Sequence, residues 1–406
     1  MSLIVPIWYL VLAGILPQIS EAIYSPALPA VALDLHTTAT MMQYTLSIFL
    51  LGFGAGVLFW GRLSDFIGRK PALLWGMILF ALASLGCYLA TNIETLLLCR
   101  FFQAFGGATG SVIGQAICRD AFDGAMKGRV FSSISAAMSL SPALGPIIGG
   151  LTVDYVGWRM VFLFFVVGGL ATSLLGLKHL PETHGEQSRM VSKPEVLTIF
   201  KRMIKDPKVL VFGGLVGGLN GIGFAYYGEG PFYLITLLGL SPTLYGMSFI
   251  AIAMGFLIGN LSSKFFHHKG IAYQKMISWG LTLVLGAGFL FSVCALSGLI
   301  SPHHGTPSAF ITVSCMFISA IGTGMTIANT LAFALDRYQD CVGTASSLFG
   351  AYYYTLVSLI TFILGSIRQN NVWLMPCFFL FIGVILFCLF KWWNPKVGTL
   401  NTDDFP

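Results

Sequence analysis

Residues 61–71 read GRLSDFIGRKP and separate two long apolar stretches of the chain. Glycine tolerates backbone angles that other residues avoid, so we expect Gly61 and Gly68 to permit a tight reversal between two helices. The three basic residues of the stretch would hold this loop in the cytosol, because short cytoplasmic loops of membrane proteins accumulate positive charge. The carboxylate of Asp65 then needs a positive partner, which an arginine or a helix N-terminus would supply. The stretch predicts a charged turn between two membrane-spanning helices.

The composition is that of an integral membrane protein. Of 406 residues, 56% are hydrophobic and 9% charged, and the mean hydropathy is +0.82, which no ordinary water-soluble core explains. Apolar stretches of about 20 residues recur, the length that a helix needs to cross ~30 Å of hydrocarbon. The alternation typical of barrel strands is absent. We predict twelve helices, at 4–33, 40–61, 70–90, 94–118, 128–153, 157–177, 209–238, 243–263, 272–297, 308–333, 341–365 and 370–392.

The basic residues predict the orientation of these helices. With the N-terminus inside, 19 of the 22 lysines and arginines fall on the cytoplasmic side, seven of them in the long linker 178–208. Arg159 and Arg368 fall outside, and Arg100 lies within a helix. We therefore expect both termini in the cytosol. The net charge of +6 then reflects topology and contact with anionic membrane lipids, and we expect no nucleic-acid partner.

Two further stretches have a distinctive composition. Residues 100–107 read RFFQAFGG, and residues 141–150 read SPALGPIIGG. Small residues let helix backbones approach closely, and the prolines at 142 and 146 remove backbone donors and bend the helix. A helix of this kind would seal an interface between two bundles of helices. The alternative is a glycine-rich and proline-rich packing face with no special part in transport.

Together, these three motifs resemble those of the major facilitator superfamily, in particular its drug/proton antiporter branch. Residues 24–31, YSPALPAV, and 343–348, GTASSL, are similar to the bicyclomycin-resistance (Bcr/CflA) subfamily. Two departures are Ser141, where that motif usually has glycine, and Glu229, which is not a feature we associate with the subfamily. The resemblance implies two pseudo-symmetric six-helix bundles. Their expected bounds are 1–177 and 209–392, with a cytoplasmic linker at 178–208 and a tail at 393–406.

The resemblance also implies a function. The implied protein is a monomeric exporter in the bacterial inner membrane. It would exchange protons for small amphipathic compounds or drugs, driven by the proton-motive force and without a cofactor. The nearest alternative is a dedicated exporter of one metabolite, such as a siderophore. An intramembrane enzyme or a receptor is less favoured, because the sequence has no HExxH or GxSxG motif and no sensor domain. No metal-ligand spacing is present either.

Charged residues within predicted helices are candidates for proton coupling. An ionised carboxylate within the membrane costs ~2.5–3.5 kcal/mol. Burial disfavours its charged form and a nearby cation favours it, so we expect the proton occupancy of Glu21 to change as its surroundings change. Arg100 lies at a comparable depth on the fourth helix. The two would act together directly, or through Tyr24, Gln103 or water. In the alternative, Glu21 is permanently neutral or faces water, and Arg100 is a structural tie.

Substrate contacts are expected from acids and aromatic residues near the expected cavity, since aromatic faces with polar tips suit planar amphipathic ligands. For Glu229, a solvated helix end is an equal alternative, and the tyrosines would otherwise be packing residues. The candidate substrate residues are Glu21, Tyr24, Gln103, Tyr226, Tyr227, Glu229 and Tyr353.

Gating residues are expected in the motifs and in the fourth cytoplasmic loop, whose charges would pair with the Asp65 loop as a gate network. In the alternative, these charges are solvated and their exposed pairs are worth only ~0–1 kcal/mol. The charged residues of this loop are Arg119, Asp120, Asp123, Lys127 and Arg129. The resemblance implies that Asp65 faces the start of the eleventh helix, near Gly343, and locks the cytoplasmic side of the outward-open form. Residues 259–264 are a faint second copy of 61–65, with Ser263 in place of the acid. The candidate gating residues are Gly61, Asp65, Gly68, Arg69, Arg119, Arg129, Gly145 and Pro146.

Overall fold

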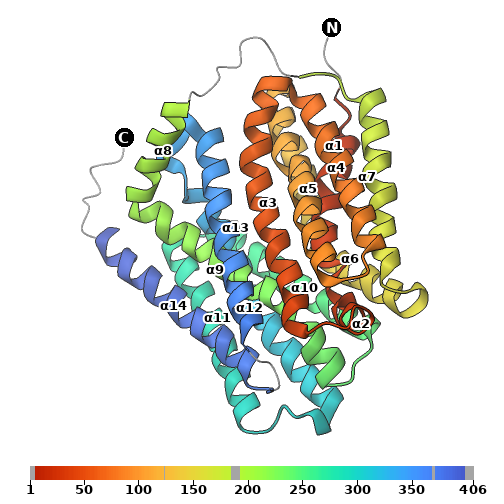
Figure 1. The fold of residues 1–406 in the computed structure, drawn as a ribbon. Coiled ribbons are helices and arrows are strands. Elements are labelled where there is room, and N and C mark those ends of the chain that lie inside the picture. The colour runs from red at the N-terminus through yellow and green to blue at the C-terminus, as the bar shows by residue number, and fades with distance from the viewer. Residues whose placement is uncertain (1–4, 123, 184–192, 368–370, 398–406) are drawn as a thin grey trace.

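The computed structural model describes residues 5–122, 124–183, 193–367 and 371–397, and within them all regular secondary structure is helical (Figure 1). Eleven helical segments of this described part are long and apolar enough to cross a membrane. The 33-residue helix α6 (Gly124–Val156) is the twelfth long helix, in the place of the predicted fifth. An all-helical structure suits a membrane, because a helix satisfies its backbone hydrogen bonds internally.

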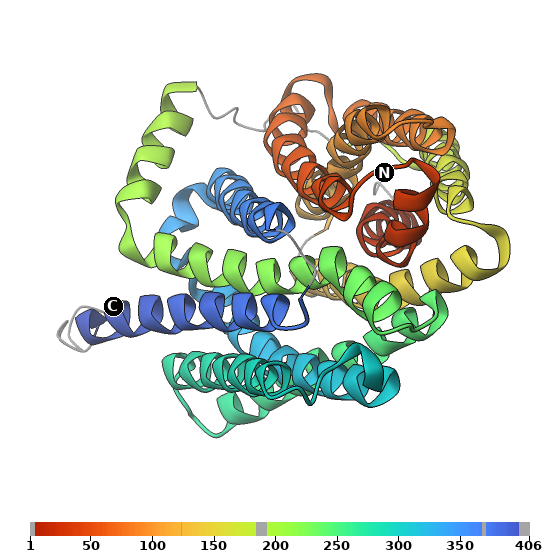
Figure 2. The ribbon, with the colours of Figure 1, turned by 60° about the horizontal axis from the view of Figure 1, so that its bottom comes forward.

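The helices form two bundles that follow one another along the chain. The N-terminal bundle contains α1 (Ile7–Ala22), η1 (Ser25–Ala27), α2 (Leu28–Asp34), α3 (Ala39–Ile67), α4 (Arg69–Leu89), α5 (Ile93–Ala121), α6 and α7 (Arg159–His179). The C-terminal bundle contains α9 (Pro207–Pro231), η2 (Phe232–Leu237), α10 (Pro242–His268), α11 (Tyr273–Leu296), η3 (Pro302–His304), α12 (Gly305–Phe333), η4 (Asp336–Cys341), α13 (Val342–Ser366) and α14 (Leu374–Val397). Figures 1 and 2 show the two bundles side by side, red to yellow and green to blue.

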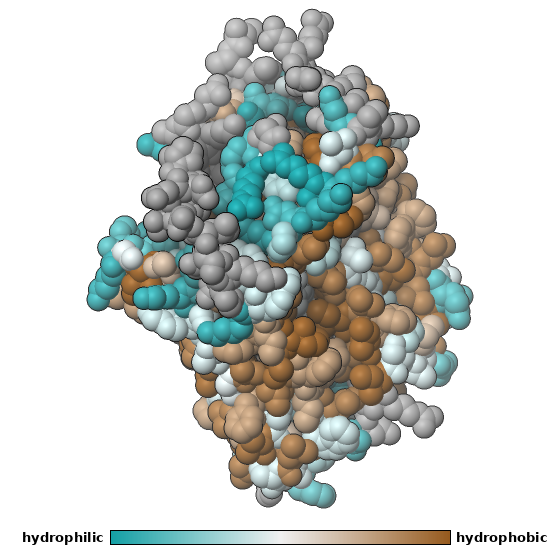
Figure 3. Space-filling view, turned by 90° about the vertical axis from the view of Figure 1, so that its left-hand side faces the viewer, coloured by the Kyte–Doolittle hydropathy of each residue, from teal (hydrophilic) through white to brown (hydrophobic). Residues whose placement is uncertain are grey.

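Helix α8 (Lys193–Lys205) lies in the predicted linker and was not expected from the sequence. It runs along one end of the molecule, which also holds the turn at Gly68; we call this the linker end, and the opposite one the far end (Figure 1). Met203 is buried, and Nη2 of Arg202 donates to the carbonyl oxygen of Arg337 at 2.7 Å. Figure 3 shows polar residues gathered at the linker end beside a broad apolar surface, as expected for helices that face lipid.

The charged turn differs from its prediction. Helix α3 continues to Ile67, so Gly61 lies inside a helix and the expectation that it helps to turn the chain is wrong. The reversal needs Gly68 alone, whose φ of +95° is costly for other residues, because α4 begins at the next position. A methyl group at Gly61 would make only ordinary contacts, at 3.4 Å to Val112 and 3.9 Å to Ser347, so close packing does not require a glycine at this position.

Glycine packing relates the two bundles, and it corrects the proposed second copy of the motif. A methyl group on Gly56 would lie 2.5 Å from the carbonyl oxygen of Phe105, and one on Gly259 would meet the carbonyl oxygen of Ile321 in the same way. In each bundle the second long helix therefore packs against the fourth through a glycine. Gly259 is the counterpart of Gly56 rather than of Gly61, and residues 259–264 lie inside α10.

Two predicted helices are interrupted. The first ends as an α-helix at Ala22 and continues through η1 to α2, because Pro26 has no backbone N–H to donate. The seventh ends at Pro231 and is followed by the single π-helical segment η2 of the described residues. Both breaks lie next to candidate acids, Glu21 and Glu229, so irregular backbone occurs where the ionisable groups are.

Candidate functional site

Glu21 lies in the last turn of α1, immediately before the helix breaks. Pro17 lies one turn earlier, and the Ser20 hydroxyl donates to its carbonyl oxygen at 2.7 Å. The side chain of Glu21 is buried, and its Oε1 has no hydrogen-bond partner among the described residues. A buried, unsatisfied carboxyl oxygen is rare in proteins and calls for a functional explanation.

Arg100 on α5 is fully buried near Glu21. Its Nη1 donates to Oε1 of Gln103 at 2.6 Å and reaches the carbonyl oxygen of Ser20 at 3.5 Å. The guanidinium lies over the ring of Tyr24, 4.5 Å from its centroid, and over that of Phe49 at 4.1 Å. Such cation–π contacts partly replace the lost hydration of the charge. Arg100 is thus held by two rings, an amide and a carbonyl.

The question of direct contact between Glu21 and Arg100 is answered by this geometry. The described residues show no ion pair between them, and the arginine reaches only the backbone of the neighbouring Ser20. Nε and Nη2 of Arg100, like Oε1 of Glu21, have no partner in the described structure. Glu21 therefore keeps one unpartnered oxygen and Arg100 two unpartnered nitrogens within the described structure.

The two bundles are held together at the far end by hydrogen bonds. Ser25 of η1 donates to the carbonyl oxygen of Tyr227 at 2.6 Å and bonds the Tyr245 hydroxyl at 2.7 Å. Gln43 of α3 donates to the buried carboxylate of Glu229 at 2.5 Å. The alternative of a solvated Glu229 is wrong, because the close approach of the bundles excludes water there.

Close backbone contact between α6 and α10 completes the closure of the far end. A methyl group on Gly246 of α10 would collide with the carbonyl oxygen of Pro146, and one on Gly150 of α6 with that of Pro242. Asp154 of α6 accepts hydrogen bonds from the backbone N–H of Thr243, at 3.0 Å, and from its hydroxyl. The glycine-rich and proline-rich stretch of α6 therefore lies directly at the interface of the bundles.

The linker end is hollow instead. A cavity of about 330 Å³ lies between α3 and α5 of one bundle and α12 and α13 of the other. Its walls include Arg119 and Gln115 from α5, and Tyr353 and Tyr354 from α13. The two halves thus meet at the far end and enclose an open volume towards the linker end, as one state of an alternating-access transporter requires.

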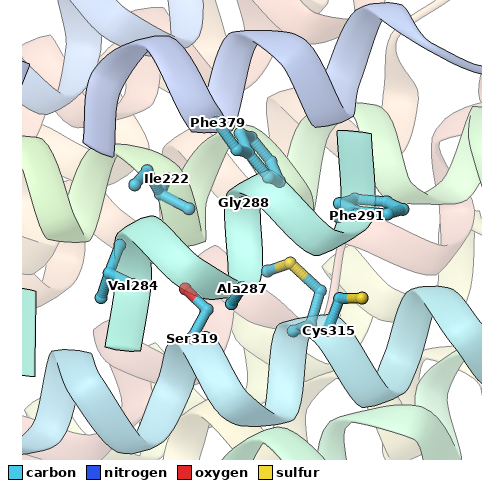
Figure 4. Close-up of a pocket in the computed structure, with 9 residues that line it drawn as sticks. Ile222, Val284, Ala287, Gly288, Phe291, Cys315, Ser319 and Phe379 are labelled. Atoms are coloured by element: carbon cyan, nitrogen blue, oxygen red, sulfur yellow. The ribbon is translucent and has the colours of Figure 1, made fainter. Parts of the chain in front are cut away.

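A second pocket lies inside the C-terminal bundle, between α9, α11, α12 and α14 (Figure 4). Its volume is about 10 Å³, room for about one water molecule. Apolar side chains such as Ile222, Val284 and Phe379 point into it. This pocket is a small packing space and too small for a ligand.

Arg69 organises the charged turn. Its Nη1 bonds Asp65 at 2.5 Å and Ser64 at 2.7 Å, and its Nε bonds Asp120 at 2.9 Å, in the last turn of α5 rather than in the predicted fourth loop. The carboxylate of Glu182 accepts the backbone N–H of Arg69 at 2.9 Å, next to the positive end of α4. Of the expected network between the fourth loop and the Asp65 turn, the described structure shows the bond of Asp120 to Arg69, and a role as a gate stays a prediction. Gly343 lies across the interface, on the wall of the cavity.

Replacing Arg69 with alanine is expected to destabilise the linker end. Three charge-assisted side-chain hydrogen bonds would be lost, and because Asp65 is partly exposed the loss should be ~2 kcal/mol rather than their sum. Lysine should recover little, because it lacks the guanidinium fork. The measurement is the Tm of the detergent-purified protein. The neighbouring Arg62→Ala is the control, and an equal fall in its Tm would show a general charge effect.

The other candidate residues are distributed over these regions. Tyr353 lines the cavity, whereas Tyr24 and Gln103 surround Arg100. Tyr226 and Tyr227 lie at the far-end closure, where the Tyr227 hydroxyl donates to the Pro142 carbonyl at 3.2 Å. Their roles in substrate binding stay predictions.

Among the candidate gating residues, Arg129 is exposed on α6, and a methyl group on Gly145 would press against Ala22. Asp123, a further acid of the fourth loop, lies outside the described residues. The sequence analysis did not identify Gln43 or Ser25 as site residues. Each is recognisable only as a polar residue in an apolar segment.

This fold and its interface define a multi-pass membrane transporter rather than an enzyme. A model of the Major Facilitator Superfamily matches residues 10–361, and the chain belongs to that superfamily. It is 35% identical over 389 residues to an uncharacterized transporter of Rickettsia bellii, with 94% of each chain covered. It is 27% identical to a bicyclomycin resistance protein homolog of Haemophilus influenzae, over 88% of each. A solved D-xylose-proton symporter has the same fold, with a TM-score of 0.74, 13% identity, and coverage of 94% of this chain and 96% of that one.

Proposed function

We propose that this protein is a proton-coupled antiporter that exports small amphipathic compounds across the bacterial inner membrane. The proposal rests above all on Glu21, a buried acid with an unpartnered oxygen beside a buried arginine with two unpartnered nitrogens. Intramembrane ionisable residues of this kind mark proton and substrate pathways. The relatives named for bicyclomycin and multidrug resistance favour drugs as the exported compounds. The protein needs no cofactor beyond the proton-motive force.

The positive charges favour a cytoplasmic linker end, so that the structure represents the inward-facing state. A compound would enter the cavity from the cytosol while the far end is closed by Gln43 and Glu229, and by α6 and α10. Opening of the far end would break these contacts and release the compound outside. The linker end would close over the cavity in that state, with Asp65 approaching the start of α13.

The proton would enter on Glu21 in the outward-facing state and leave to the cytosol in the state described here. When Glu21 is ionised, the unpartnered nitrogens of Arg100 can donate hydrogen bonds to its carboxylate. When Glu21 is neutral, the arginine is stabilised by the two aromatic rings and by the amide oxygen of Gln103. Protonation would therefore change the contacts around the break at the end of α1. This break adjoins Ser25, which bonds the other bundle at the far end. Inward proton movement supplies ~2.3 kcal/mol per charge per 100 mV from the potential alone.

The test is uptake into inside-out membrane vesicles with an acidic lumen. The first ligands to try are bicyclomycin and chloramphenicol. The Haemophilus influenzae relative is named for resistance to the first, and a Pseudomonas aeruginosa relative, 26% identical, is named as a chloramphenicol resistance protein. Accumulation should require this protein and should collapse when nigericin dissipates the pH gradient. Accumulation that persists without the gradient would rule out proton coupling and leave the transporter assignment intact.

A further inference from the structure

We propose that Glu229 is a second proton-binding site, which takes its proton from the outside and holds the far end closed while it is neutral. The inference rests on the proposed opening of the far end to the outside, and it adds a site that is distinct from the proposed coupling site at Glu21. It follows from the contact that Glu229 makes across the bundles, from the groups around it, and from its separation from the linker-end cavity.

The contact of Glu229 requires the far end to be closed. Among the described residues, the one side chain that hydrogen-bonds its carboxyl group is Gln43 of the other bundle, at 2.5 Å. Gln43 lies close to two helices of the C-terminal bundle. A methyl group on Gly228 of α9 would lie 3.6 Å from its side chain, and one on Gly365 of α13 would lie 2.8 Å from its Oε1. Separation of the bundles would therefore break this bond and uncover Glu229.

The surroundings of Glu229 favour a neutral carboxyl group. The described residues show no ion pair of Glu229, Gln43 offers a neutral amide, and the residue is only 6% exposed. An ionised carboxyl group in such a place would lose its hydration without gaining a partner charge. The titratable side chains next to Glu229, or next to Tyr233 beside it, are phenols and a thiol, which are neutral at physiological pH. They are Tyr226, Tyr233, Tyr245 and Cys315.

Glu229 is also separated from the linker-end cavity. It is not among the lining residues, and the phenol with which it interacts electrostatically is that of Tyr233 in η2, at the far end. The carboxyl group of Glu21, in contrast, lies close enough to interact with Tyr353 and Tyr354 of the cavity wall. A proton on Glu21 thus lies next to the space that opens at the linker end, whereas a proton on Glu229 would exchange with the far side alone. Glu229 would not carry protons across the membrane.

The protonation of Glu229 would then set the balance between the two states. Water would hydrate Glu229 when the far end is open, and a hydrated glutamate is ionised at neutral pH. Closing would therefore take up one proton from the outside, and opening would release it there. By linkage, each unit of fall in external pH would favour the closed far end by up to ~10-fold. An acidic exterior, which also drives export, would return the transporter to the state that loads from the cytosol.

The experiment measures opening of the far end by the rate at which a membrane-impermeant maleimide labels Ser25→Cys, on the full chain in nanodiscs. Every protein also carries Glu21→Gln, so that the proposed coupling site cannot ionise, and labelling of the native cysteines is subtracted. We compare pH ~5.5 with pH ~7.5, both above the usual range of a hydrated glutamate. Labelling should rise at least ~10-fold more in the protein with Glu229 than in Glu229→Gln, whose neutral side chain should keep the far end closed at both pH values.

The ratio between these two proteins cancels other effects of pH. It removes the pH dependence of the thiol itself and the contributions of His36 and His303, exposed far-end residues that titrate in this range. Glu229→Ala, which likewise cannot ionise, should also lack the response, and it replaces the glutamine variant if that variant does not fold. Glu229→Asp should restore the response. Size-exclusion profiles check that each variant folds.

Two control variants test other charges of the far end. Glu94→Gln, which neutralises an exposed acid, should keep the full response. So should Arg368→Gln, at a position that follows α13 and lies outside the described residues. Its loss there would show that a cation rather than a proton neutralises Glu229, and would overturn the inference.

Three further results would also overturn it. They are an equal rise in labelling of Glu229→Gln, rapid labelling of Glu229→Gln at both pH values, and the same labelling of the protein with Glu229 at both pH values. A failure of the proposed function would appear instead as uptake that is independent of the proton gradient in protein with Glu21 intact, however Glu229 responds.

Discussion

Vesicles that contain the Glu21→Gln variant should accumulate no more ligand in response to an acidic lumen than vesicles without the protein. Glutamine keeps the size of the side chain and hydrogen-bonds as a neutral group, but it cannot release a proton. The buried carboxyl with its unused oxygen is the group that we propose to exchange protons as the α1 break rearranges beside Arg100. Uptake driven by the pH gradient should therefore be lost. The measurement is the initial rate of uptake at a fixed gradient.

The comparison that isolates proton coupling is ligand binding without a gradient, which Glu21→Gln should retain because Glu21 does not line the cavity. Glu94→Gln, which neutralises an exposed acid in the first turn of α5, should leave uptake unchanged. Full gradient-driven uptake by Glu21→Gln would exclude Glu21 as the coupling site. It would favour the alternative of a permanently neutral carboxyl.

Substitution of Gly246 by leucine should also abolish transport, but by preventing closure of the far end. Even a methyl group at this position would collide with the carbonyl oxygen of Pro146 on the other bundle, and backbone cannot retreat as a flexible side chain can. The state described here would then be strongly disfavoured and the outward-facing state would accumulate. A cysteine introduced at Ser25, now buried in the interface, should become reactive to a membrane-impermeant maleimide added from outside.

Gly286→Leu is the matched control, since a side chain at that exposed glycine of α11 meets nothing within 4 Å. It should transport normally and leave the cysteine at position 25 protected. Background labelling of the native cysteines is measured in protein without Ser25→Cys and subtracted. Protection of that cysteine in both leucine variants would show that the contact between α6 and α10 does not control the far end.

Much of the fold could be predicted from the sequence, because membrane crossing depends on local properties. The length and hydropathy of each apolar stretch, and the basic residues in turns such as 61–71, locate a membrane helix without reference to its neighbours in the fold. The structure shows long helices at all twelve predicted positions. The motifs identified the family for the same reason, and the comparison confirms the superfamily.

Smaller features of the same segments escaped prediction because two signals compete. Gly61 has the chemistry of a turn residue, but it lies inside α3, and Gly68 alone turns the chain. Helix α8 lies in a highly charged stretch, and its apolar residues, which recur every three to four positions, are too few to resemble a membrane span. Local pattern shows which conformations are allowed, and packing selects between them.

The arrangement of the candidate site was decided by tertiary structure. Glu21 and Arg100 are recognisable as costly charges in apolar helices, but only the folded chain shows that rings and an amide, rather than an ion pair, surround the arginine. Gln43 and Glu229 are 186 positions apart, and no periodicity in the sequence joins them. Which segments cross the membrane follows from local sequence, because hydrophobic burial and backbone hydrogen bonding act on each helix separately. Which end of the molecule is closed was decided by contacts between bundles, since these depend on the positions of all the helices at once.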